Sequence, residues 1–252
     1  MQKTEQEFHI LCAPGDVGRY CILPGDPGRC EKIAAYLEEP RLIAHNREFV
    51  TYTGTLAGEK VSVVSTGIGG PSAAIAMEEL VHLGATHFIR VGTCGGIQLE
   101  VSAGDLIIAQ SSVRQEGLSF EYAPVGYPAT ADFDLMCRLT EAARELQAPY
   151  HVGVVQSKDS FYGQHAPESM PVAPQLIAKW QAYKQLGVLA SEMESAALFV
   201  VAAARGVHCA AVFTAVWNQE REKAGMDQNQ DFDTELAIRC AVLALKKAIT
   251  EG

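Results

Sequence analysis

Residues 88–96 read Phe88-Ile89-Arg90-Val91-Gly92-Thr93-Cys94-Gly95-Gly96, an apolar run that ends in a glycine-rich turn. The run lacks the polar alternation of a strand with one wet face, and only Arg90 interrupts its apolar part. It therefore predicts a strand that is buried on both faces, as in a parallel or mixed sheet covered by helices.

Similar runs recur along the chain and alternate with helical patterns. The other expected strands are 20–23, 61–65, 106–109, 152–156 and 210–216, and the expected helices are 72–83, 133–146, 192–204 and 234–249. This alternation predicts the α/β class, with residues 1–252 forming a single domain around a central mixed β-sheet flanked by helices. Ligands of such sheets bind at the carboxyl ends of strands. The one long irregular stretch, 160–174, is expected to be a functional loop.

The composition is that of an ordinary globular protein, with 48% hydrophobic and 20% charged residues among 252. The net charge of −10 makes nucleic acid an unexpected partner, because nucleic-acid binders carry a basic surface. The polar start, 1–7, does not resemble a signal peptide, and Arg205, Gly206 and His208 interrupt the most apolar region. We expect a soluble, cytoplasmic protein that does not bind a membrane.

The seven cysteines are odd in number and include no CxxC pair, which argues against a zinc knuckle or a disulfide framework. We expect them to be small buried side chains in a reducing compartment. The histidines show no HExxH or comparable spacing, so a catalytic metal is not predicted.

Three expected strand ends carry glycine-rich turns: Pro24-Gly25-Asp26-Pro27-Gly28-Arg29, Thr66-Gly67-Ile68-Gly69-Gly70-Pro71-Ser72, and the turn after Arg90. None has the pattern of a Walker loop or a dinucleotide fingerprint. A glycine turn that opens a helix offers backbone N–H groups to an anion, and an arginine adds a charge-assisted fork. A surface position would also explain Arg29, and a buried salt bridge would also explain Arg90. The three turns together favour an anion site, with the Thr93 hydroxyl beside Arg90.

Five motifs, PGDPxR, HNREF, TGIGGPS, RVGTCGG and SEMES, follow one another in this order. They resemble the nucleoside phosphorylase-I family, and most closely its uridine-cleaving members. The resemblance runs from about Phe8 to the final helix. It implies the fold of that family and a pentosyltransferase that converts uridine and phosphate reversibly to uracil and ribose 1-phosphate, in pyrimidine salvage.

The resemblance also implies how phosphate is held. Gly25, Arg29, Arg90 and Thr93 match its phosphate-binding positions. Arg47 matches an arginine that reaches into the phosphate site of the neighbouring subunit. Such a shared site requires a homo-oligomer, and the family implies dimer units assembled to a hexamer.

Two further groups of residues match positions at the subunit interface of the family. His9 matches a histidine that contacts the ribose across that interface. Glu48, Ile68 and Ser72 match positions that hold a monovalent cation, K⁺, between subunits in some relatives. The resemblance implies no other cofactor.

The segment Ser191-Glu192-Met193-Glu194-Ser195 opens the most apolar expected helix. Without the resemblance, Glu192 and Glu194 would be first-turn acids that the helix dipole favours. The resemblance implies that Glu194 binds the ribose hydroxyls and that Met193 packs against the sugar.

The base is expected near Phe161, which could stack on a pyrimidine, and near Gln164, whose amide matches the edge of uracil. Uridine-cleaving relatives carry an arginine two residues after this glutamine, where this chain has Ala166. We expect His165 or Lys158 to stabilise the negative charge on O4 of the leaving uracil instead. Ordinary surface charge on a loop would also explain both residues.

Purine-cleaving relatives place a proton-donating aspartate after the last strand, where residues 215–220 of this chain contain none. Trp217 replaces a smaller residue there, and both features favour a pyrimidine. The expected reaction is displacement at the ribose C1′ by phosphate, without a covalent enzyme intermediate. A nucleosidase, a purine nucleoside phosphorylase and a nucleoside-binding protein without turnover remain as alternatives, and the phosphate dependence of turnover separates them.

Overall fold

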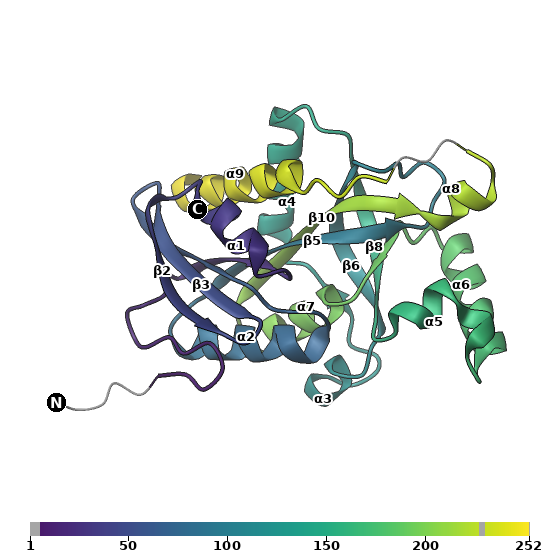
Figure 1. Cartoon of the computed structure of the whole chain (residues 1–252), viewed down its shortest axis with the longest axis horizontal. Coiled ribbons are helices and arrows are strands. Elements are labelled where there is room, and N and C mark those ends of the chain that lie inside the picture. The colour runs from purple at the N-terminus through teal and green to yellow at the C-terminus, as the bar shows by residue number, and fades with distance from the viewer. Residues whose placement is uncertain (1–5, 227–229, 252) are drawn as a thin grey trace.

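The computed structural model describes residues 6–226 and 230–251. One ten-stranded sheet runs through the molecule, and helices cover both of its faces (Figure 1). The strands are β1 Tyr20–Pro24, β2 Glu38–Asn46, β3 Phe49–Leu56, β4 Glu59–Val64, β5 His87–Gly96, β6 Leu106–Gln115, β7 Ala129–Thr130, β8 Tyr150–Lys158, β9 Ala190–Glu192 and β10 His208–Asn218.

The helices alternate with the strands, as the sequence predicts. They are α1 Gly28–Ala34, α2 Gly70–His82, α3 Ser119–Tyr122, α4 Phe133–Glu145, α5 Phe161–His165, α6 Ala173–Gln185, α7 Ser195–Arg205, α8 Gln219–Lys223 and α9 Glu235–Glu251, with a 3-10 turn at Pro167–Ser169. The predicted α/β class with a central mixed sheet is confirmed.

The sheet has the strand order β10-β6-β8-β9-β5-β1-β4-β3-β2, with β7 paired to β6. β10 also pairs with β5 in parallel, so five strands, β5, β10, β6, β8 and β9, close on themselves. β9 runs antiparallel to β5, with Ser191 opposite Gly95. This closure places β9 between the ends of β5 and β8, where several of the predicted site residues lie.

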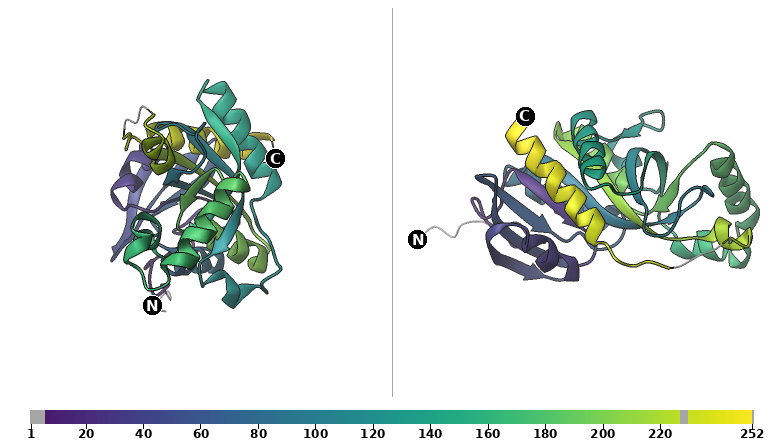
Figure 2. Two further views of the ribbon diagram at one scale, coloured as in Figure 1. Left: turned by 90° about the vertical axis from the view of Figure 1, so that its right-hand side faces the viewer. Right: turned by 90° about the horizontal axis from the view of Figure 1, so that it is seen from above.

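Two apolar clusters hold the helices on the sheet. One cluster joins α2 and α7 to one face through side chains such as Met77, Leu80 and Phe199. The other joins α1, α4 and α9 to the opposite face through Ile33 and Leu139 among others. Figure 2 shows α9, in yellow, lying across this second face. Burial of both faces explains why the central strands are continuous apolar runs.

Two predictions about local structure are wrong, and one hairpin was missed. The stretch 160–174 is not an irregular loop, because it contains α5, the 3-10 turn and the start of α6. The β2–β3 hairpin was not expected at all. The helix expected from Glu192 begins at Ser195, and Glu192 itself lies in β9, where it is held by long-range pairing to β8.

The seven cysteines, all in the described part of the chain, are free thiols, and six of them are buried. Within residues 6–226 and 230–251, no helix combines the length and apolar character needed to cross a membrane.

Candidate functional site

Arg90 lies in the middle of β5 and is only 4% exposed. Its Nη2 donates to Glu194 Oε2 at 2.6 Å, and its Nη1 donates to Thr66 Oγ1 at 2.9 Å. Its Nε has no partner among the described residues. Arg90 is therefore in a buried ion pair, the alternative that the sequence left open, and still offers one unpaired N–H. A buried unpaired donor of this kind points to a missing acceptor.

Arg29, in the first turn of α1, is close enough to Arg90 for the two charges to interact. Its Nη1 donates to the carbonyl oxygen of Val91 at 3.4 Å, and its side chain is 14% exposed. Burial lowers the pKa of Arg29, and the nearby Arg90 charge lowers it further. The Asp26 carboxylate, 3.9 Å from Arg29 Nε, and Glu194 offset part of this repulsion, and an anion between the two guanidinium groups would relieve the rest. Arg29 is therefore not a simple surface arginine.

The glycine turns come close to these arginines. A side chain at Gly25 would place Cβ 3.2 Å from Arg90 Nη2 and 3.2 Å from the carbonyl oxygen of Gly67. Only glycine leaves this space free for a small ligand. Thr93 lies further along β5 and is partly buried, but no hydrogen bond joins it to Arg29 or Arg90 among the described residues.

Glu194 is the residue just before α7, and it connects the arginine side of the site to the second glycine turn. Its Oε1 accepts from the backbone N–H of Gly69 at 2.7 Å, while its Oε2 accepts from Arg90. Each carboxylate oxygen keeps a second lone pair for a further donor. Met193, next to it, is partly buried.

Glu192 is not an acid in the first turn of a helix, because it lies in β9 just before α7. Its Oε2 accepts from the backbone N–H groups of Glu194 and Ser195, at 2.7 and 2.9 Å, and its Oε1 accepts from the Ser157 and Ser195 hydroxyls. Burial raises the pKa of Glu192, as does the Glu194 carboxylate. With all its acceptors engaged, Glu192 stabilises the entrance to α7 and holds Glu194 in place.

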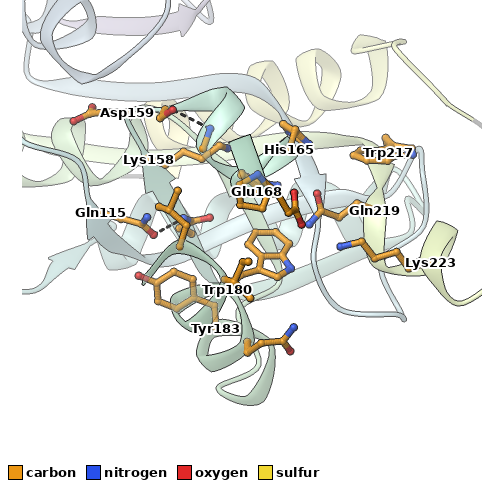
Figure 3. Close-up of a pocket in the computed structure, with 18 of the residues that line it drawn as sticks. Gln115, Lys158, Asp159, His165, Glu168, Trp180, Tyr183, Trp217, Gln219 and Lys223 are labelled. Carbon is orange, nitrogen blue, oxygen red and sulfur yellow. Dashed lines mark hydrogen bonds between the residues drawn. The ribbon is translucent and has the colours of Figure 1, made fainter. Parts of the chain in front are cut away.

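A cavity of about 590 Å³ opens between the end of β8, α5, α6 and the end of β10. In Figure 3, Lys158 and Gln115 lie at one end of it and Trp217, Gln219 and Lys223 at the other, with His165 and Trp180 between them. Three of the residues expected to contact the base, Lys158, Gln164 and His165, line this cavity. Its polar and aromatic walls suit a flat heterocycle.

Phe161 does not line the cavity directly, but its ring lies 4.3 Å from that of His165. The His165 ring is in turn 5.6 Å from that of Trp217, so the three rings form a row. Burial lowers the pKa of His165, and the Lys158 charge adds to the effect. His165 is therefore neutral near pH 7 and can act as a hydrogen-bond partner.

Lys158 is not the surface charge that the sequence left open. It is the last residue of β8, it is 5% exposed, and its Nζ donates to Ser191 Oγ at 2.6 Å. Burial lowers the pKa of Lys158 to about 8, although Glu192 and Glu194 act in the other direction. A buried ammonium group beside a polar cavity is poised to meet developing negative charge.

The remaining predicted residues gather elsewhere, around the tip of the β2–β3 hairpin. His9 Nδ1 lies 2.6 Å from Glu79 Oε1, and Arg47 is exposed at the hairpin turn with φ 54°. Among the described residues, no hydrogen bond or ion pair joins His9 or Arg47 to Arg29, Arg90 or Glu194. This end of the molecule lies opposite α5, α6 and α8 (Figure 1).

The predicted cation residues also meet near this hairpin. Ser72 Oγ donates to Glu48 Oε1 at 2.9 Å, and exposed Ile68 lies in the turn between β4 and α2. Hydrogen bonds from its own backbone and from Ser72 lower the pKa of Glu48. One carboxylate with neutral oxygens beside it suits a hard cation of low charge. Among the described residues, no group of three or more His, Cys, Asp or Glu side chains is arranged to hold a metal ion.

Sequence reasoning missed Thr66, Gly69 and Ser191 as individual site residues. Thr66 and Gly69 lie inside a motif that was recognised, so strand-end position was a usable signal. Ser191 gave no such signal, because its partners, Lys158 and Gln164, are 33 and 27 residues away.

The chain is similar in sequence to known phosphorylases. Residues 19–250 match the model of the phosphorylase superfamily. The chain is 53% identical to a uridine phosphorylase of Treponema pallidum, over 98% of this chain and 96% of that protein. It is 45% identical to a uridine phosphorylase of Thermococcus kodakarensis, over 88% and 82% of the two chains. It is also 37% identical to a guanosine phosphorylase of Halorubrum lacusprofundi, over 90% and 89%.

Proposed function

Since the chain belongs to the phosphorylase superfamily, we propose that it is a uridine phosphorylase, which splits uridine with inorganic phosphate into uracil and ribose 1-phosphate. One observation carries the phosphate-dependent part of this proposal. Partly buried Arg29 and buried Arg90 are close enough to act on each other's charge next to two glycine-rich turns, and one N–H of Arg90 is unpaired among the described residues. Water as the nucleophile would need no such arrangement, which argues against a nucleosidase.

Phosphate binds, in this proposal, between Gly25, Arg29, Arg90 and Thr93. The backbone of Gly25 approaches closely, and the two guanidinium groups neutralise and orient the dianion. Arg47 of a neighbouring subunit completes the site, which is supported by its exposed position at a hairpin turn. A nucleoside-binding protein without turnover would have no use for these groups.

The ribose lies between the phosphate and the base. Glu194 accepts hydrogen bonds from the ribose hydroxyls through the lone pairs that Arg90 and Gly69 leave free, and Met193 packs against the sugar. His9 of the neighbouring subunit contacts the ribose from the other side. If Arg47 and His9 act across the interface, a dimer is the smallest active unit, and we propose a hexamer built from three such dimers.

Uracil occupies the cavity beside Gln164, His165 and Lys158, with Phe161 extending the aromatic wall. A phosphate oxygen attacks C1′ while the C1′–N1 bond breaks, and its electron pair leaves with uracil. The ring carbonyls share that negative charge. Lys158 stabilises it as a buried cation, His165 as a hydrogen-bond donor, and solvent protonates the anion after release.

The end of β10 argues against the alternative that the chain is a purine nucleoside phosphorylase. The residue after Trp217 is Asn218, which is fully buried. Its Nδ2 donates to the carbonyl oxygens of Gln98 and Val101, and its Oδ1 accepts two N–H groups at the start of α8. It can neither protonate a purine nor turn toward one. The guanosine-cleaving relative is also less similar than the two uridine phosphorylases.

We propose that residues 1–252 act as a single nucleoside phosphorylase domain in the cytoplasm, without a cofactor in the reaction. Glu48 and Ser72 side-chain oxygens, with the Ile68 backbone, would hold a K⁺ ion at the subunit interface and stabilise the dimer. Uracil release from uridine, followed with and without phosphate, tests the function directly.

A further inference from the structure

One chain of hydrogen bonds joins three elements under the floor of the cavity. Lys158 Nζ, at the end of β8, donates to Ser191 Oγ on β9 at 2.6 Å. Ser191 Oγ donates in turn to Gln164 Oε1 on α5, also at 2.6 Å. Ser191 is 2% exposed, and Lys158 and Gln164 both line the cavity.

The direction of both bonds follows from the chemistry of the groups. An ammonium group has three donors and no acceptor, so the Ser191 oxygen must accept from Lys158. The hydroxyl then has a single proton to give, and the acceptor within reach is the amide oxygen of Gln164. A reversed amide would exchange this acceptor for an N–H donor and leave the Ser191 proton without a partner.

We infer that Ser191 is a positioning residue for the reaction, because its hydroxyl, held by Lys158, fixes which end of the Gln164 amide faces the base. The amide oxygen is held inward, so the Nε2 donors are presented to a ring carbonyl of the pyrimidine. The second lone pair of the same oxygen accepts from the ring N3–H. Uracil matches this donor-and-acceptor order, whereas cytosine has no N–H at N3. This inference rests on the proposed function and assigns the selection of the base to a residue that touches no substrate.

The backbone around Ser191 supports a fixed geometry. Ser191 lies in a short strand paired on both sides, opposite Gly95 on β5 and Gln156 on β8. The neighbouring Glu192 is fully bonded at the entrance of α7. A hydroxyl on such a backbone has little freedom, so its partner on the short helix α5 takes its orientation from it.

Ser191 also affects the charge of Lys158. Burial disfavours the ammonium group, while the bond to Ser191 favours it. Glu192, Glu194 and Cys94 on β5 also favour the charged form of Lys158. His165 on α5 is close enough for the Lys158 charge to lower its pKa. Removal of the hydroxyl leaves these groups in place but takes away the neutral acceptor that Lys158 has among residues 6–226 and 230–251, so Lys158 then loses its proton at a lower pH.

The experiment compares Ser191→Ala and Ser191→Thr with the wild-type chain. For Ser191→Ala we expect kcat/KM for uridine to fall about tenfold or more, the range of a hydrogen bond to a charged group. We also expect the alkaline limb of its pH profile to move to lower pH and the preference for uridine over cytidine to shrink. Ser191→Thr keeps the hydroxyl and should restore all three properties.

Ser62→Ala is the matched control, since Ser62 is also a buried strand serine, bonded to Gly18 and Thr53 away from the cavity. It should lower the thermal midpoint without changing the pH profile. Thermal midpoints of all variants show that each is folded. If Ser191→Ala keeps kcat/KM within twofold and keeps the alkaline limb, the inference about Ser191 is overturned while the proposed function stands. If the wild-type chain releases no uracil from uridine, the proposed function falls and this inference falls with it.

Discussion

Arg90 Nη2 and Glu194 Oε2 form a buried ion pair, 2.6 Å long, between residues that are 104 positions apart in the chain. The pair joins β5 to the start of α7. It also joins the arginine that is expected to bind phosphate to the carboxylate that is expected to bind ribose. Stability and activity should therefore be linked at this contact.

The first prediction concerns this ion pair. Glu194→Ala leaves the Arg90 charge buried and uncompensated, which should lower the free energy of unfolding by roughly 3–5 kcal/mol. Glu194→Gln keeps the hydrogen-bonding shape and should cost less stability, while both variants lose most of their activity. Urea denaturation measures the first effect and initial rates the second. Equal unfolding midpoints for Glu194→Ala and wild type would show that the pair is not structurally important.

The second prediction concerns Arg29. Arg29→Ala should raise the KM for phosphate by about tenfold or more, because a charge-assisted bond to the anion is lost. The KM for uridine should change much less. Arg239→Ala, on the exposed side of α9, is the control and should alter neither constant. An unchanged KM for phosphate in Arg29→Ala would remove Arg29 from the phosphate site.

The third prediction concerns the pH dependence of turnover. Lys158 has a pKa of about 8, and only its charged form stabilises the uracil anion. Activity should therefore be retained below that pH and decline as the pH rises through it. Lys158→Met should be less active and should lack this decline. A wild-type profile that stays flat from pH 7 to pH 9.5 would argue against the role of Lys158.

The fourth prediction concerns acid stability at the opposite end of β5. Burial, together with the charges of His208 and Arg19, lowers the pKa of His87 to about 4 from its usual 6.5. Between these values the unfolded chain binds the proton and the folded chain does not, so stability falls as the pH drops from 6.5 to 4. His87→Gln should flatten that fall. Urea midpoints at pH 7 and pH 5 measure it, and equal slopes in both proteins would contradict the assignment.

The central strands and most of the long helices could be predicted from the sequence, because burial on both faces leaves continuous apolar runs. The β2–β3 hairpin could not, since β2 is an exposed edge strand with an interior Pro40 and irregular pairing. Helix α6 was missed for a related reason, since it buries no residue and its Leu176, Ile177 and Trp180 line the cavity instead of entering the core.

The candidate site, too, could be predicted only in part. Local motifs indicated the glycine turns, Arg29 and Arg90, because strand ends carry visible sequence signals. Contacts across the closed strands could not be read from one chain, and these include the Arg90–Glu194 pair and the bonds of Lys158 and Gln164 to Ser191. The helix-like pattern at Glu192 was misleading, because a strand pairing set by β5 and β8 overrides it.

The most direct measurement is uracil release by the purified chain from uridine, with and without inorganic phosphate, and with inosine in parallel. We expect cleavage of uridine that saturates with phosphate, ribose 1-phosphate as the second product, and little cleavage of inosine. Cleavage of uridine without phosphate, or of inosine alone, would contradict the proposed function.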